Sequence, residues 1–142
     1  MTYAATDFQD ARYPLGVQEF PIKNTDVVAM VPGQVVKLDT AHLMSTTQGQ
    51  VGVILCTGVT DTPLGVIIED IPVGGQGRMQ VVGAAWCIAS GAITAGAVVG
   101  ASSTAGDVIA YTTTDPYLGV ALSTATNAAD PVLVMIRPGT TA

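Results

Sequence analysis

The sequence predicts an all-β fold, a compact barrel or sandwich of short strands. Short apolar runs rich in Val and Ile alternate with turns that contain Gly, Pro, Asn or Asp, a spacing typical of barrels and sandwiches. Only one short stretch, residues 39–47, favours a helix. The motif Leu-Gly-Val also occurs twice, at residues 64–66 and 118–120, each time shortly after an Asp and a Pro.

The Leu-Gly-Val motif is flanked by the same kinds of segment, in the same order, in both halves of the chain. A strand that starts with Gly precedes each motif, at residues 33–38 and 96–100, and an apolar strand follows, at residues 79–82 and 132–136. This order predicts an internal duplication. We expect each motif to be a strand entered from a turn, because Pro fixes φ and Gly permits a bulge or the close approach of another backbone.

Taken in order, the chain begins with an extended arm, residues 1–20, which Pro21 ends. Residues 21–142 form a single barrel-like domain, in keeping with the length of the chain. The helix candidate is one or two turns long and has Asp39 or Thr40 as its N-cap. Trp86 is expected in the core, since it lies in an apolar strand. Strands are predicted at residue 22 and at residues 27–31, 35–38, 51–57, 64–68, 79–82, 86–89, 97–99, 108–111, 118–122 and 132–137.

The charge balance excludes some classes of partner. The chain has 11 acidic residues against five Lys and Arg, and only 11% of its residues are charged, whereas about a quarter is usual. The cations are scattered singly, so direct binding of nucleic acid, which needs clustered cations to replace counterions, is not expected. So low a charge favours a surface partly covered by copies of the chain or by a larger assembly.

The cysteines and the apolar runs point to no membrane or redox role. Cys56 and Cys87 lie in separate apolar runs and are expected to be buried free thiols, although the sequence leaves a disulfide between them open. The N-terminus has no signal-peptide pattern. Residues 79–106 carry no charge, but Gly and Ser interrupt this span repeatedly, so we expect short strands rather than a membrane helix.

No pattern in the sequence predicts catalysis, a metal or a cofactor. His42 is the only histidine, and its neighbours supply no partner for catalysis or metal binding. The segment at residues 74–78 is rich in Gly but lacks the Gly-Lys-Ser/Thr of a phosphate loop, so a hairpin turn is expected. Nucleophile–His–acid and metal-ligand patterns are missing as well. We therefore expect a protein that is not an enzyme.

The acidic residues of the two motifs are expected to serve structure. Asp61 is followed by Thr62 and Pro63, where an aspartic-protease loop requires Gly after the Asp and Thr. Asp61 and Asp115 are therefore predicted to initiate turns by accepting backbone N–H groups. Glu69 and Asp70 are adjacent, and adjacent residues of a strand face opposite sides, so they are not expected to share a site.

The order of these segments resembles the small capsid cement, or decoration, proteins of tailed phages, a family formerly described as phage recombinases of the RecA/RadA type. The resemblance covers roughly residues 22–139, and its most specific parts are residues 92–99, 118–122 and 134–139. It implies a β-barrel-like domain that binds the outer surface of an assembled capsid and stabilises it, commonly as a homotrimer. The recombinase description finds no support, because neither Lys23 nor Lys37 lies in a Gly-rich loop.

The resemblance also implies a partner and a location. The partner would be the major capsid protein, and the protein would be made in the host cytoplasm and lie on the exterior of the virion. In this setting the arm can lie across a neighbouring subunit, with Tyr3, Phe8, Tyr13 and Phe20 as its contacts to the capsid or to other copies. The alternative is that these aromatic residues cover the chain's own barrel.

Other functions remain open from the sequence. One is a different structural subunit of the virion, such as a tail-tube or head-completion protein, which is also rich in strands. Another is a carbohydrate-binding β-module, for which one Trp and four Tyr offer little support. The oligomeric state and the binding partner would separate these functions.

Overall fold

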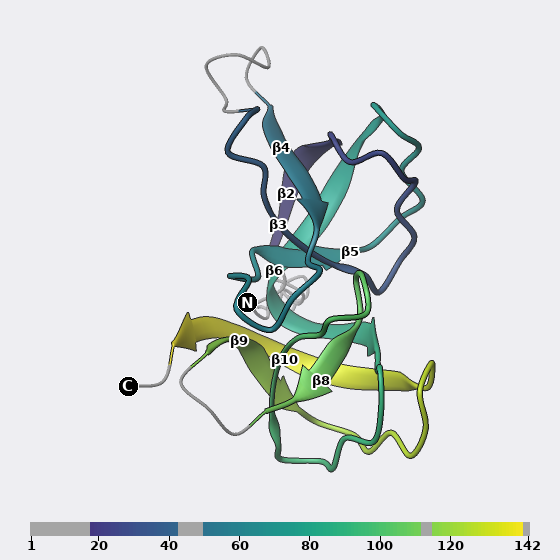
Figure 1. Cartoon of the computed structure of the whole chain (residues 1–142), viewed down its shortest axis with the longest axis vertical. Helices are drawn as coiled ribbons and strands as arrows, with labels where there is room; N and C mark the ends of the chain where they lie inside the picture. The colour runs from purple at the N-terminus through teal and green to yellow at the C-terminus, as the bar shows by residue number, and fades with distance from the viewer. Residues whose placement is uncertain (1–17, 43–49, 112–114, 141–142) are drawn as a thin grey trace, which may run out of the picture.

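The computed structural model describes residues 18–42, 50–111 and 115–140, with side chains up to residue 137. This part of the chain contains strands and turns and no helix, which confirms the all-β prediction (Figure 1). The strands are β2 (Gln18–Asn24), β3 (Val35–Leu38), β4 (Val51–Leu55), β5 (Gly65–Ile67), β6 (Gln76–Ile88), β7 (Val98–Ala101), β8 (Val108–Ala110), β9 (Pro116–Ala121) and β10 (Pro131–Thr140).

The first five strands form a closed barrel. Its strand order is β2-β4-β3-β5-β6, and β2 pairs with the first half of β6 to close the ring. All pairs are antiparallel except β2 with β4. Its interior is filled by one buried cluster, which contains Ile22, Met30, Val36, Val53, Leu55, Ile67, Ile71 and Met79. We call this part the first unit.

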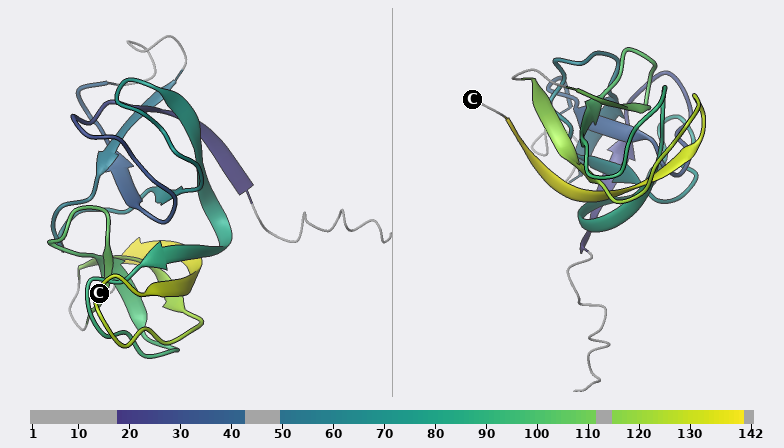
Figure 2. Two further views of the ribbon diagram at one scale, coloured as in Figure 1. Left: turned by 90° about the vertical axis from the view of Figure 1, so that its right-hand side faces the viewer. Right: turned by 90° about the horizontal axis from the view of Figure 1, so that it is seen from below.

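The second half of β6 continues into a second sheet with the order β6-β10-β9-β7-β8, which we call the second unit. Its pairs are antiparallel. A parallel bridge between Ala89, just after β6, and Val108 in β8 joins the two ends of this sheet. The two units lie one above the other along the long axis of the molecule, and β6 runs from one to the other (Figure 2).

The shared strand β6 differs from the prediction of two strands at residues 79–82 and 86–89. It is one strand of 13 residues, and Gly83 within it has φ of +97°. Glycine adopts this left-handed conformation without the steric cost of a Cβ, so the strand bends there instead of ending. The second buried cluster includes Val35, Cys56 and Val66 of the first unit. The cores of the two units therefore join.

The structure confirms the predicted duplication, because the two units repeat the same pairing. Val36 in β3 lies opposite Gly65 in β5; correspondingly, Val99 in β7 lies opposite Gly119 in β9. The bridges outside the strands repeat as well: Met30 pairs with Ile71, and Ile93 pairs with Ala125. Each bridge has two backbone hydrogen bonds of 2.8–2.9 Å.

The glycine of each Leu-Gly-Val motif is explained by its neighbour in the sheet. A Cβ on Gly65 would lie 2.7 Å from the carbonyl oxygen of Gln80 in β6. A Cβ on Gly119 would overlap the carbonyl oxygen of Met135 in β10. Both glycines thus allow the close approach of a backbone that the sequence predicted.

The duplicated turns differ at one position that carries strain. Gly74 has φ of +76° and donates its N–H to Asn24, whereas Ala129 has φ of +73° and donates its N–H to Ala89. The left-handed conformation costs a residue with a Cβ about 1–2 kcal/mol. The second unit therefore keeps the turn of the first unit without the glycine that suits it.

We expect Ala129→Gly to raise the free energy of unfolding by about 0.5–1 kcal/mol, because relief of the strain exceeds the entropy that Gly adds to the unfolded chain. Ala128→Gly, in the same exposed turn but without a positive φ, is the control and should be neutral or slightly destabilising. Urea denaturation measures both. Equal effects of the two variants would contradict the strain at Ala129.

Two predicted segments are described only in part. Of the predicted arm, residues 18–20 lie in β2, which continues through Pro21. Residues 1–17 of the predicted arm lie outside the described residues. Asp39 accepts a hydrogen bond of 3.0 Å from the N–H of Ala41, as an N-cap does, but residues 43–47 of the predicted helix also lie outside the described part.

Candidate functional site

The one histidine has a partner that the sequence did not suggest. Nδ1 of His42 lies 2.9 Å from Oδ2 of Asp39. The same oxygen accepts a hydrogen bond of 2.6 Å from the hydroxyl of Thr25. This is not a catalytic triad, because the hydroxyl faces the carboxylate rather than the imidazole. The Thr25 hydroxyl, above all, lowers the pKa of Asp39.

The described residues hold no group of three His, Cys, Asp or Glu that could bind a metal ion. Nor does that part of the chain contain a helix long and apolar enough to cross a membrane. Cys56 and Cys87 are buried and free, which confirms the predicted free thiols. Burial raises the pKa of each thiol to about 12, so neither forms a reactive thiolate near neutral pH.

Asp61 stabilises the turn before β5, as predicted. Its Oδ2 accepts the backbone N–H groups of Thr57 (2.8 Å) and Gly58 (3.1 Å). Its Oδ1 lies 2.8 Å from Nζ of Lys37 in β3. Burial raises the pKa of Asp61, but the Lys37 ammonium and the two N–H donors together outweigh burial, so the pKa is lowered.

A lowered carboxyl pKa makes stability depend on pH. The contribution of Asp61 is complete above the carboxyl pKa of the unfolded chain, about 3.9, and is lost as the pH falls through the lower pKa of the folded state. We expect Asp61→Asn to reduce the free energy of unfolding by about 1–2 kcal/mol at pH 7 and by less at pH 3. The exposed Asp70→Asn is the control. A loss for Asp61→Asn that did not shrink in acid would contradict this role.

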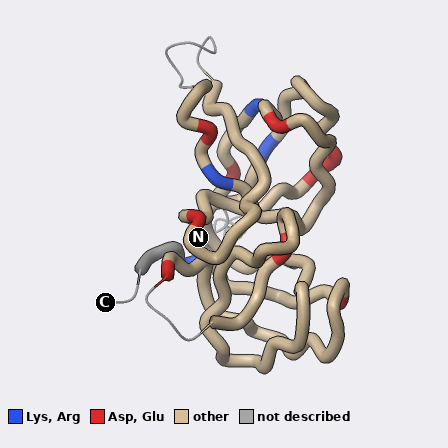
Figure 3. Tube along the Cα trace, in the orientation of Figure 1, with Lys and Arg blue, Asp and Glu red and all other residues tan. Residues whose placement is uncertain are grey.

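The charged residues are distributed unequally over the two units, which makes the second unit a candidate for interactions. Most lie on the first unit (Figure 3). One cluster there joins Arg78 to Glu19 (2.7 Å) and Glu69 (3.2 Å). After residue 82, the described residues contain four charged side chains, Asp107, Asp115, Asp130 and Arg137.

Three apolar side chains extend across the outer face of the second unit, and we call them the Trp86 row. Trp86 in β6 is 58% exposed and lies opposite Leu133 in β10. Leu122, next to the end of β9, is also exposed and donates its N–H to the carbonyl of Leu133 (2.7 Å). The prediction that Trp86 lies in the core is wrong, because residues of a strand alternate between two faces and its neighbours Ala85 and Cys87 occupy the buried one.

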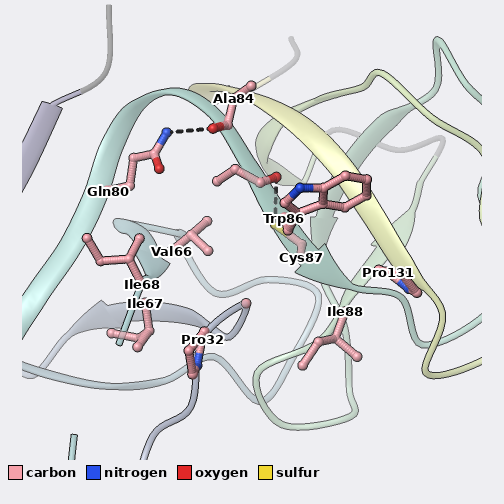
Figure 4. A pocket seen from close by; sticks show the side chains of 12 residues that line it. Pro32, Val66, Ile67, Ile68, Gln80, Ala84, Trp86, Cys87, Ile88 and Pro131 are labelled. Atoms are coloured by element: carbon pink, nitrogen blue, oxygen red, sulfur yellow. Dashed lines mark hydrogen bonds between the residues drawn. The ribbon is translucent and has the colours of Figure 1, made fainter. Parts of the chain in front are cut away.

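A pocket of about 380 Å³ lies beside this row, where β6 bends from one unit to the other (Figure 4). Apolar side chains of both units line it, and the amide of Gln80 projects into it. The apolar lining residues include Pro32, Val66, Ile67, Trp86, Ile88 and Pro131. Sequence reasoning missed this site, although the uncharged span at residues 79–106 contains Trp86 and all of the β6 residues that line the pocket.

Phe20 is the one predicted contact residue that the structure describes, and it does not line the pocket. Tyr3, Phe8 and Tyr13 lie outside the described residues. Phe20 is in β2 opposite Met79, and 37% of its surface is exposed. At the pocket the structure brings together Trp86 and Gln80, which the sequence did not suggest as site residues.

A family model described as phage cement protein matches residues 18–136. Among solved structures, the N base of the head fiber gp8.5 of bacteriophage phi29 is similar, with a TM-score of 0.65 and 13% sequence identity. That alignment covers 84% of this chain and 95% of the other, and at this identity the likeness concerns the fold. A search of curated proteins finds no match.

Proposed function

The chain belongs to the phage cement protein family, and we propose that it binds the outer surface of an assembled phage capsid and stabilises it without catalysis. The observation that carries this proposal is the family match over residues 18–136. A protein of this family is a structural component associated with the phage particle.

The distribution of charge, together with the Trp86 row, supports this role. A cement protein has to contact a shell on one side and water on the other. The first unit has the charged surface that water favours, and the second unit has the Trp86 row and few charges. Each contact can be weak, because the capsid presents many equivalent sites and linked contacts multiply affinity.

The partner in this proposal is the major capsid protein, and the cement protein acts as a homotrimer on the capsid exterior. In such an assembly Tyr3, Phe8, Tyr13 and Phe20 are contacts to the capsid or to other copies. We expect deletion of residues 2–15 to weaken head binding at least tenfold, because aromatic residues supply much of the affinity of protein interfaces. Unchanged binding by a deletion variant that unfolds like the full chain would remove the arm from the interface.

The deciding experiment measures the mass of the purified protein by light scattering and then its binding to undecorated, expanded heads of the phage that encodes it. Bound copies are counted by quantitative gel analysis, and the heat resistance of the heads is compared with and without the protein. We expect saturation at a copy number set by the capsid symmetry, and more resistant heads. Rings or tubes that form without heads, and no binding to heads, would instead indicate a tail-tube or head-completion subunit.

A further inference from the structure

The pocket beside the Trp86 row contains a polar group that no described residue satisfies. Gln80 in β6 is only 7% exposed. Its Nε2 donates to the carbonyl oxygens of Val82 (3.0 Å) and Ala84 (2.8 Å). Since a carbonyl oxygen only accepts hydrogen bonds, these two contacts determine which end of the amide is nitrogen. The carbonyl end, Oε1, is left facing the pocket (Figure 4).

No residue among those described donates a hydrogen bond to Oε1 of Gln80. Oε1 is open to the pocket, so it can accept a hydrogen bond from a donor group that enters there. The rest of the lining is apolar, with Val66 and Ile67 of β5 on one side and Trp86 and Ile88 of β6 on the other. The pocket therefore combines an apolar wall with one acceptor, as ligand sites do.

The surroundings restrict the charge and size of what can enter. None of the lining residues is charged, so a charged group would lose its hydration in the pocket without gaining an ion partner there. A volume of about 380 Å³ is at the small end of ligand pockets and suits a single large side chain. Tyrosine and tryptophan combine an apolar ring with one N–H or O–H donor.

We propose that this pocket receives a tyrosine or tryptophan side chain of the capsid protein, whose hydroxyl or indole N–H donates to Oε1 of Gln80. Trp86 packs against the inserted ring, and Leu122 and Leu133 extend the contact across the outer face of the second unit. This proposal rests on the proposed function and names the contact site.

The area of this face favours the capsid over a second copy as its occupant. Complete burial of the exposed parts of Trp86, Leu122 and Leu133 would remove on the order of 300 Å² per molecule, less than half of the ~800 Å² per partner that a stable interface uses. A pair of copies joined by this face alone would separate on dilution. A capsid, by contrast, presents the partner side chain in many copies and retains weakly bound molecules by avidity.

The first test compares head binding by Trp86→Ala, Gln80→Met and the control Val59→Ala, which changes an exposed residue outside the pocket. We expect Trp86→Ala and Gln80→Met to bind heads about 10–100-fold more weakly than the unchanged protein, and Val59→Ala to bind as well as it does. Denaturation curves identify any loss of folding in Gln80→Met, while the exposed Trp86 can be changed without disturbing the core. If the unchanged protein binds heads and both pocket variants bind equally well, the pocket proposal is overturned and the proposed function stands.

The second test needs no capsid. Trp86 is the only tryptophan of the chain, so its indole N–H gives a unique NMR signal at the pocket. We expect N-acetyltyrosinamide to shift this signal at lower concentration than N-acetylphenylalaninamide does, and the difference to vanish in Gln80→Met. An equal response to both compounds in the unchanged protein would contradict the role of Oε1. If Trp86→Ala instead dissociates an oligomer of the free protein, the occupant is a second copy and not the capsid.

Discussion

Replacing Gly119 with Ala is expected to lower the free energy of unfolding by about 3 kcal/mol or more, because the added methyl group has no space. A Cβ at this position in β9 would overlap the backbone carbonyl of Met135 in β10. β10 is paired on both sides, with β9 and with β6. It cannot move away from the new methyl group without breaking hydrogen bonds to one of its neighbours. Urea denaturation followed by circular dichroism measures the loss.

Two further glycine variants serve as the comparison and the control for Gly119→Ala. Gly65→Ala changes the equivalent position in β5, where the Cβ would lie 2.7 Å from the carbonyl oxygen of Gln80, and we expect a smaller but clear loss. Gly91→Ala is the control, because no atom lies within 4 Å of its added Cβ and its φ is not positive. It should change stability by less than about 0.5 kcal/mol. Similar values for Gly119→Ala and Gly91→Ala would refute the close-approach explanation of the Leu-Gly-Val motif.

The second large effect is expected at Asn24, a completely buried polar residue at the end of β2. Its Nδ2 lies 2.9 Å from the carbonyl oxygen of Val28 and 3.1 Å from that of Ile71. A third carbonyl oxygen, that of Pro72, lies 3.2 Å away. The amide thus holds the loop after β2 against the turn before β6. In the second unit the equivalent position is Ala89, and the loop that follows is shorter.

We expect Asn24→Asp to lower the free energy of unfolding at pH 7 by about 3 kcal/mol or more, because a buried carboxylate would face carbonyl oxygens that need a donor. Burial and these acceptors would raise the pKa of the new carboxyl in the folded state. The variant is then most stable below the carboxyl pKa of the unfolded chain and loses stability as the pH rises through the folded-state pKa.

Asn24→Ala is the comparison. It also removes the donor but adds no charge, so its loss should not depend on pH. Unfolding at pH 4 and pH 7 separates the two variants, and equal pH dependence would contradict the assigned role of the amide.

Local patterns in the chain predicted the strands and the repeat well. Turn residues and short apolar runs are local features, and they indicated the all-β class and most of the strands found in the described residues. The Leu-Gly-Val motif indicated the duplication, because the same close backbone approach requires glycine at both Gly65 and Gly119. Where a local signal was ambiguous, the prediction failed. The sequence predicts separate strands at residues 79–82 and 86–89, but the positive φ of Gly83 bends β6 within a continuous strand.

The sequence by itself therefore determined the fold class, the internal repeat, the low charge and the resemblance to cement proteins, since all four depend on composition or on neighbours along the chain. Only the tertiary structure decided which face of each strand is buried and which distant segments meet. The exposure of Trp86 depends on the register of β6 with β10, and the pocket depends on the bend that sets the two units against each other. The free acceptor of Gln80 likewise exists because the bend directs two backbone carbonyls at the amide nitrogen and leaves the oxygen to the pocket. Such long-range geometry has no local signature, which is why the sequence did not indicate the pocket.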